Sequence, residues 1–122
     1  MRLRLPVPAH IAKTNDEDPA EYYYKPLTGF FYRHRLELAL EALKQKSFCH
    51  LLEAGYGSGV FLPALSERTQ RLSAFDLHRN AKLVHAMLAQ EHVQANLWVS
   101  DILNISVRDQ EFDAVVCLSV LE

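Results

Sequence analysis

Short apolar runs alternate with helix-length stretches along most of this chain, and this alternation limits its fold more than any other feature. Four runs have the length and apolar content of buried strands: CHLLEAG, RLSAFDL, ANLWVSDI and, after a turn, RDQEFDAVVCLSVLE. They do not alternate cleanly between polar and apolar residues, which is typical of strands covered on both faces. Strands separated by helices predict βαβ units and a parallel sheet.

Three stretches have helical patterns. Residues 29–46, with Thr28 as a possible cap, repeat their leucines at a helical period. VFLPALSER follows the first strand, and its Pro63 is tolerated because proline fits the first turn of a helix. NAKLVHAMLAQEH is amphipathic. Its buried face is expected to contain Leu83, Val84, Met87 and Leu88.

The composition is that of one soluble globular domain, with 122 residues, 49% hydrophobic and 23% charged. A net charge of −2 gives no electrostatic footprint for nucleic acid or a membrane, so neither partner is expected. Cys49 and Cys117 lie in strand-like runs without CxxC spacing. We expect both to be small buried side chains in a reducing compartment, and the protein to be cytoplasmic.

The stretch LLEAGYGSGVF contains three of the four glycines in the chain. Glycine allows positive φ and lets a ligand approach the backbone, and the helix start beyond it adds free N–H groups. This combination suits the ribose or phosphate part of a nucleotide-like ligand. Glycines also end strands for purely structural reasons, so the motif alone leaves both interpretations open.

Acidic residues stand near the carboxyl ends of the first three predicted strands. These are Glu53, Asp76 and Asp101. In a wound sheet these strand ends are neighbours, so the three carboxylates are expected to ring one crevice, where Asp76 can accept hydrogen bonds from ribose hydroxyls. The alternative is that aspartates simply end strands or cap helices.

Two nucleotide classes compete for this crevice. A dinucleotide fingerprint needs a third glycine where this chain has Val60. The pattern present is acidic-x-Gly-x-Gly-x-Gly, beginning at Glu53. Here the sequence resembles the class I S-adenosylmethionine-dependent methyltransferases, over roughly residues 22–122, in LLEAGYGSGVF, LSAFDLHRN, LWVSDI and FDAVVCLSVLE. The last stretch is particularly characteristic of the small-molecule and quinone-biosynthesis-like branch.

The resemblance implies an S-adenosylmethionine site made from residues at or just after the strand ends. They are Glu53, Gly55, Tyr56, Gly57, Gly59, Asp76, Leu77, Asp101, Ile102 and Leu118. It implies that Gly55, Gly57 and the Tyr56 backbone line the methionine and ribose portion. It also implies that Glu53 helps to orient the cofactor's amino group.

The remaining roles follow from the same resemblance. Asp76 would bind the ribose hydroxyls, and Leu77 would pack on the adenine. Asp101 would accept from the adenine amino group, and the Ile102 amide would face a ring nitrogen. The Leu118 carbonyl would take the methionine ammonium.

The segment before the first strand resembles the helical lid that these enzymes place over the cofactor. Its aromatic residues are Tyr22, Tyr23, Tyr24 and Phe31. Arg33 is a candidate partner for the cofactor carboxylate.

The alternation of strands and helices predicts an α/β fold, and the resemblance implies a Rossmann-like doubly wound parallel sheet truncated to about four strands in the order 3-2-1-4. Residues 1–21 are expected to form an irregular arm, and residues 22–122 a partial methyltransferase domain. Within it, 22–46 form the helical lid and 47–122 the cofactor-binding βαβ half. The apolar fourth strand would be an uncovered edge, so we expect self-association, with dimers as the simplest outcome.

The function implied is methyl transfer from S-adenosylmethionine to a small-molecule acceptor, with this chain supplying the cofactor-binding half. The alternatives are a half-domain that binds the cofactor or a nucleoside, or dimerises, without catalysis, and an NAD-binding domain, which Val60 disfavours. No residue has the spacing of a general base or a metal site, so the catalytic residues stay unknown. His85 and His92 share a helix face and are expected to face solvent.

Overall fold

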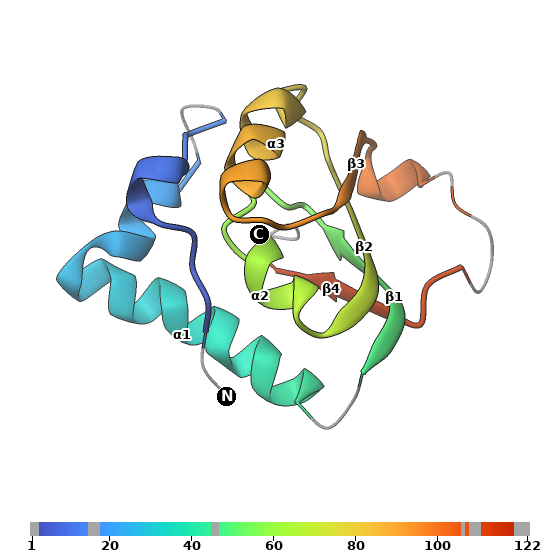
Figure 1. Cartoon of the computed structure of the whole chain (residues 1–122), viewed down its shortest axis with the longest axis horizontal. Helices are drawn as coiled ribbons and strands as arrows, with labels where there is room; N and C mark the ends of the chain where they lie inside the picture. The colour runs from blue at the N-terminus through green and yellow to red at the C-terminus, as the bar shows by residue number, and fades with distance from the viewer. Residues whose placement is uncertain (1–2, 15–17, 45–46, 106, 108–110, 119–122) are drawn as a thin grey trace.

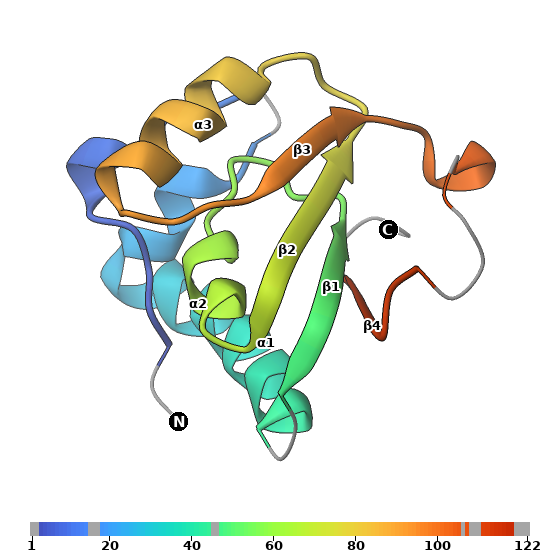
Figure 2. The ribbon, with the colours of Figure 1, turned by 45° about the vertical axis from the view of Figure 1, so that its right-hand side comes forward.

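The computed structural model describes residues 3–14, 18–44, 47–105, 107 and 111–118. Four parallel strands form one sheet in the order β3-β2-β1-β4, which confirms the predicted strand order (Figures 1 and 2). The strands are β1 (Phe48–Ala54), β2 (Thr69–Asp76), β3 (Asn96–Val99) and β4 (Ala114–Cys117). The sheet is therefore of the Rossmann-like α/β type.

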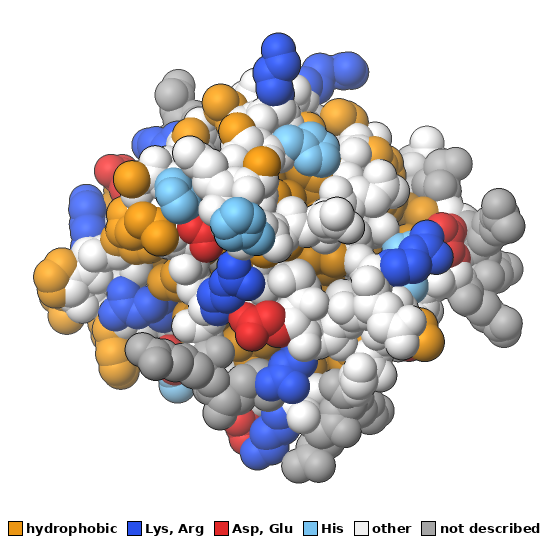
Figure 3. All heavy atoms as spheres, in the orientation of Figure 1, with side chains coloured by type: hydrophobic (Ala, Val, Ile, Leu, Met, Phe, Trp, Pro, Cys, Tyr) orange, Lys and Arg blue, Asp and Glu red, His pale blue; other side chains and the backbone are white. Residues whose placement is uncertain are grey.

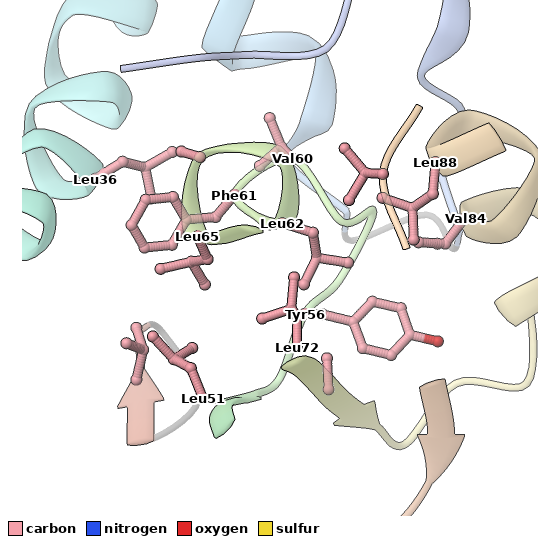
Figure 4. Close-up of a cluster of buried hydrophobic side chains, with 14 of the residues drawn as sticks. Leu36, Leu51, Tyr56, Val60, Phe61, Leu62, Leu65, Leu72, Val84 and Leu88 are labelled. Carbon is pink, nitrogen blue, oxygen red and sulfur yellow. The ribbon is translucent and has the colours of Figure 1, made fainter. Parts of the chain in front are cut away.

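Three α-helices lie on the same side of this sheet, as Figure 2 shows. They are α1 (Pro26–Leu43), α2 (Leu62–Ser66) and α3 (Ala81–Gln90). Leucines on the facing side of the sheet pack against side chains from all three helices (Figure 4). The labelled members of this cluster are Leu36, Leu51, Tyr56, Val60, Phe61, Leu62, Leu65, Leu72, Val84 and Leu88. No helix in the described parts of the chain is long and apolar enough to cross a membrane.

Helix α1 begins earlier than its leucine pattern predicts. Proline occupies its first turn, where the missing N–H has no helical partner to lose, and Lys25 is the N-cap. The prediction that Thr28 caps the helix was therefore wrong, and its hydroxyl donates to the Tyr22 carbonyl at 3.3 Å instead. Leu36 and Leu40, one turn apart, are the leucines that α1 buries. The predicted end at Lys46 lies outside the described residues.

Helix α3 confirms most of its predicted buried face. Val84, Met87 and Leu88 are buried, whereas Leu83 is 42% exposed and was wrongly placed in the core. The helix ends at Gln90, and His92 beyond it has a φ of 58°. His92 therefore does not share a helix face with His85, although both side chains are exposed.

The opposite face of the sheet carries a smaller apolar cluster. Leu52, Ala54 and Phe75 are its buried members, packed against Trp98, Ile102 and Phe112. Cys49 and Cys117 are both exposed, so the prediction that they are buried was wrong. They lie near strand ends, and Cys117 belongs to β4 at the sheet edge, where fewer elements cover a side chain.

The N-terminal arm is fastened to the end of α3. It contains two 3-10 helices, η1 (Pro8–His10) and η2 (Ala20–Tyr24). The buried Glu91 carboxylate accepts from the Val7 amide at 2.9 Å and lies 2.5 Å from Nδ1 of His10. Burial raises the pKa of Glu91, but the Val7 amide and His10 oppose it and leave the pKa below its ordinary value. The arm therefore packs on the body of the protein through a buried anion.

Candidate cofactor-binding site

A cavity of about 400 Å³ lies where all four strands reach their carboxyl ends. Glu53 and Gly55 line it from β1, Asp76 from β2, Ile102 from beyond β3 and Leu118 from beyond β4. Parallel strands bring their carboxyl ends to one edge of the sheet, which is why residues far apart in sequence meet here. The N-terminal arm and α1 form the remaining wall.

The glycine loop holds three residues in the left-handed region. Gly55, Gly57 and Gly59 have φ values of 80°, 57° and 82°. A Cβ on Gly57 would meet nothing within 4 Å, so this backbone faces open space at the cavity. A Cβ on Gly59 would lie 2.7 Å from Cγ1 of Val84. Gly59 is outside the cavity lining, so its predicted contact with the cofactor is replaced by a packing role against α3.

Gly59→Ala is expected to destabilise the fold by about 1–3 kcal/mol more than Gly57→Ala. Both alanines carry the backbone cost of positive φ, and only the one at position 59 collides with α3. Urea unfolding of the two variants measures the difference. Equal losses of stability would show that α3 does not need a glycine at this point of contact.

Asp76 ties the glycine loop to the end of β2. Its Oδ2 accepts from the Gly57 amide at 2.7 Å, and its Oδ1 accepts from the amides of Leu77 at 2.7 Å and His78 at 3.4 Å. An ionised carboxylate has about four lone-pair sites, so Asp76 keeps some capacity to accept from a ligand. The side chain therefore fixes the loop and lines the cavity at the same time.

Glu53 is a buried carboxyl group on the cavity wall. It is 4% exposed, and its Oε1 has no hydrogen-bond partner among the described residues. Burial, and then the nearby charge of Asp76, raise the pKa of Glu53 to about 8. A buried polar atom without a partner is costly, so this oxygen is matched to a ligand that brings a donor.

Tyr56 adds a second buried polar atom that has no partner in the part of the chain that the structure describes. Its ring meets His78 edge-on, with centroids 5.0 Å apart, and its hydroxyl is buried. Burial, and then Asp76, raise the pKa of Tyr56 to about 12. The hydroxyl therefore stays neutral and can donate.

The cation on the cavity wall is Arg35, two residues beyond the predicted Arg33. Arg35 lies over the ring of Tyr32 at 5.4 Å, and it opposes the rise that burial causes in the pKa of Tyr23. The guanidinium of Arg33 instead donates to the Tyr23 carbonyl at 2.6 Å and does not line the cavity. The helical period places Arg33 on the face of Leu36 and Leu40 and Arg35 away from it, so the sequence pattern did not indicate Arg35.

The predicted aromatic lid reaches the cavity through Tyr23. Tyr22 stacks on Tyr32, and the Tyr24 hydroxyl donates to the Pro6 carbonyl at 2.7 Å. Phe31 is 64% exposed and lies outside the cavity lining. These three side chains therefore do not cover the site as expected.

Asp101 also departs from its expected place. It is exposed, and its Oδ1 accepts from the Leu103 amide at 2.9 Å, which caps the 3-10 helix η3 (Ile102–Asn104). Its side chain is outside the cavity lining, whereas Leu77 lines the cavity and is 66% exposed. The capping interpretation, left open by the sequence, describes Asp101 better than a contact with adenine.

The cavity thus brings together eight of the ten predicted residues and adds others. The eight are Glu53, Gly55, Tyr56, Gly57, Asp76, Leu77, Ile102 and Leu118. The polar lining residues that the sequence did not indicate are Thr14, Asp18, Arg35, Ser58, His78 and Ser100. Thr14 and Asp18 had no signal, because nothing local shows that the arm folds back onto the sheet.

The sheet order and the cavity at its carboxyl edge define a Rossmann-like ligand-binding unit. Residues 51–122 match the family model of the methyltransferase domain. The chain therefore belongs to this family, whose class I members use S-adenosylmethionine as cofactor.

Three known proteins show the range of the similarity. A small RNA 2′-O-methyltransferase of Arabidopsis thaliana is 29% identical over 114 residues, which are 84% of this chain and 12% of that protein. The N-methyltransferase NodS of Bradyrhizobium japonicum, solved with S-adenosyl-L-homocysteine, is 22% identical with a TM-score of 0.63, over 84% of this chain and 50% of NodS. The small RNA methyltransferase HEN1 is 30% identical with a TM-score of 0.60, over 75% of this chain and 13% of HEN1. This chain spans half of these relatives or less.

Proposed function

We propose that this chain binds S-adenosylmethionine in the cavity and supplies the cofactor-binding half of a methyl transfer to a small-molecule acceptor. The observation that carries the proposal is one cavity in which an open glycine backbone, a partly engaged carboxylate and a buried carboxyl oxygen without a partner among the described residues meet. These belong to Gly57, Asp76 and Glu53. Each matches a different part of the cofactor.

The polar residues fit the charged and hydroxyl groups of the cofactor. Asp76 would accept from the ribose hydroxyls with the lone pairs that the loop amides leave free. Oε1 of Glu53, together with the Leu118 carbonyl, would accept from the methionine ammonium. Arg35 would pair with the carboxylate, since a guanidinium is the strongest partner for that group. Leu77 and Ile102 would contact the adenine.

The bound cofactor supplies a methyl group that its sulfonium already activates, so the protein's task is to hold and orient the reactants. Glu53, Asp76 and Arg35 would fix the cofactor at three points. Tyr23 and Phe61 line the cavity with apolar surface, which excludes water from the site. His78 is engaged at both ring nitrogens by Gly57 and Asn80, so it is not placed to act as a general base.

Charge supports a small molecule as the acceptor. The cavity carries Asp18 and Asp76 beside Arg35, and Lys and Arg side chains mix with acidic ones on the face that Figure 3 shows. A phosphate backbone is bound by a continuous basic surface, which this face does not present. The competing acceptor is an RNA 2′-hydroxyl, because the Arabidopsis relative and HEN1 are both small RNA methyltransferases.

Two measurements on the full chain test the proposal. Calorimetric titration is expected to show binding of S-adenosylhomocysteine and no binding of NAD. Turnover of labelled S-adenosylmethionine with phenols, amines, carboxylic acids and a short RNA duplex then identifies the acceptor. Methylation of the RNA alone would overturn the small-molecule assignment. Binding without any turnover would leave a non-catalytic cofactor-binding unit, and NAD binding would refute the methyltransferase site.

We also propose that copies of the chain associate through β4. This strand is at one edge of the described sheet, and Val115 is 60% exposed there. An apolar edge strand offers unpaired backbone groups to a second copy. Light scattering at micromolar concentration is expected to give a mass above that of the monomer, and Val115→Lys is expected to lower it. A monomer at all concentrations would contradict the proposal.

A further inference from the structure

Three segments far apart in the sequence form one side of the cavity. They are the arm around Thr14 and Asp18, the glycine loop at Tyr56 and Gly57, and the loop that runs from β2 to α3. The arm runs beside α3 in both ribbon views (Figures 1 and 2). Hydrogen bonds join these three segments in series, and the two residues at the centre of the series are His78 and Asn80.

His78 uses both nitrogens of its ring. Its Nδ1 accepts from the Asn80 amide at 3.1 Å, and its Nε2 donates to the Gly57 carbonyl at 2.7 Å. A backbone N–H can only donate and a carbonyl oxygen can only accept. These two partners therefore select the neutral tautomer of His78 with the proton on Nε2. The ring is held further by its edge contact with Tyr56.

Gly57 is consequently held at both ends by the loop after β2. Its amide donates to Asp76 at 2.7 Å, and its carbonyl accepts from His78. This is the residue whose backbone faces open space at the cavity. The orientation of this peptide therefore depends on His78 as well as on Asp76.

Asn80 extends the series to the arm. It is the N-cap residue of α3, yet its side chain makes no capping hydrogen bond. Nδ2 of Asn80 donates to the Thr14 carbonyl instead. Asparagine is among the best N-cap residues, so an uncapped helix start indicates that the side chain serves the arm at the expense of the helix.

The arm residue that Asn80 reaches, Thr14, is bound to Asp18. Oδ2 of Asp18 accepts from the Thr14 amide at 2.8 Å and from the Thr14 hydroxyl at 2.9 Å. Oδ1 of Asp18 accepts from the Ala20 amide at 3.0 Å. Thr14 and Asp18 are both buried, and both line the cavity. The Asp18 carboxylate therefore holds Thr14 and Ala20 together at the cavity.

We infer that His78 and Asn80 are positioning residues, which link the seating of the N-terminal arm to the orientation of the Gly57 peptide at the cofactor site. A consequence of this link is that the packing of the arm and the binding of the cofactor favour each other. This consequence rests on the proposed function. If the hydrogen bond at either end of the series is lost, the arm and the glycine loop both become more mobile. Ordering them then reduces the free energy of ligand binding.

Asn80→Asp separates this role from a merely structural one. Aspartate is an equally good N-cap, so α3 should be as stable as before or more so. It cannot donate to the Thr14 carbonyl, so the arm should be released. Asn104→Asp is the matched control, since it makes the same change of charge at an exposed position of η3.

Hydrogen exchange of the ligand-free protein reads out both ends of the series. In Asn80→Asp we expect the amides of Thr14, Ala20 and Gly57 to exchange about two- to tenfold faster, with the melting temperature unchanged or raised.

Affinity for S-adenosylhomocysteine is expected to fall about two- to tenfold in Asn80→Asp and to stay unchanged in Asn104→Asp. If exchange at Thr14 were unchanged in Asn80→Asp, or if it became faster while exchange at Gly57 did not, the inference would be overturned. If the wild type does not bind the ligand, the proposed function fails, and the exchange data on the free protein still decide whether the series exists.

Discussion

Replacing Glu53 with glutamine is expected to remove a fall in stability that the wild-type protein undergoes as the pH rises from about 5 to 8. Burial, and then Asp76, raise the pKa of Glu53 from 4.5 to about 8 in the folded protein. In the unfolded chain the same group loses its proton near its ordinary pKa. Between the two values the folded state therefore binds more protons than the unfolded state.

The sign follows from this difference in bound protons. Stability falls as the pH rises wherever the folded state holds the extra proton, by about 1.4 kcal/mol per pH unit for one group. The fall should end near pH 8, where the folded-state carboxyl group itself ionises. Over the whole window the change is on the order of a few kcal/mol, which is large for a domain of this size.

Urea unfolding at several pH values across this window measures the effect. The free energy of unfolding of Glu53→Gln should be nearly flat where that of the wild type falls. Glu37→Gln is the matched control, because Glu37 is exposed on α1. Parallel curves for wild type and Glu53→Gln would show that Glu53 is already ionised in the folded protein.

The same protonation has a consequence for ligand binding. If Glu53 meets the ammonium of the cofactor, its carboxyl group must release its proton when S-adenosylhomocysteine binds near neutral pH. The enthalpy of binding should then depend on the ionisation enthalpy of the buffer. No such dependence is expected for Glu53→Gln or for 5′-methylthioadenosine, which lacks the amino-acid part.

Asp76→Ala is expected to weaken the binding of S-adenosylhomocysteine by about 1–3 kcal/mol, which is roughly ten- to a hundredfold. The substitution removes the acceptor proposed for the ribose hydroxyls. It also releases the Gly57 amide, which Asp76 holds at 2.7 Å. The substitution therefore removes a proposed contact with the ligand and a hydrogen bond that holds the glycine loop in place.

Calorimetric titration of two variants separates the site from the rest of the crevice. Asp101→Ala removes an aspartate from the next strand end, where it caps η3 outside the cavity lining. Its effect on affinity is expected to be small. Equal affinities of Asp76→Ala and the wild type would contradict the assignment of the site. A large loss in Asp101→Ala would restore the contact with adenine that the sequence predicted.

The parts of the site that sequence could predict are those fixed by strand ends. Glu53, Asp76 and the glycine loop each follow or end an apolar run, and parallel pairing carries such residues to one edge of the sheet. Their meeting in one cavity needed no knowledge of side-chain packing. The cysteines show the limit of this reasoning, because the same runs did not reveal that Cys49 near the start of β1 and Cys117 in the edge strand β4 are exposed.

Long-range packing decided the rest. Gly57 and Gly59 look alike in the sequence, and only the position of α3 separates an open backbone from a contact that needs glycine. Arg33 shares the helix face of the buried Leu36 and Leu40, but its guanidinium is used by the Tyr23 carbonyl, and Arg35 lines the cavity instead.

The sequence by itself determined the alternation of strands and helices, the carboxyl-edge site and the family, because these depend on local patterns along the chain, and the strand order followed from the family resemblance. Only the tertiary structure decided that the arm folds back over the cavity and that Asn80 holds it there. It also decided that burial and Asp76 raise the pKa of Glu53. Each of these depends on the atoms that surround a side chain in space, and those atoms come from segments that no local pattern connects.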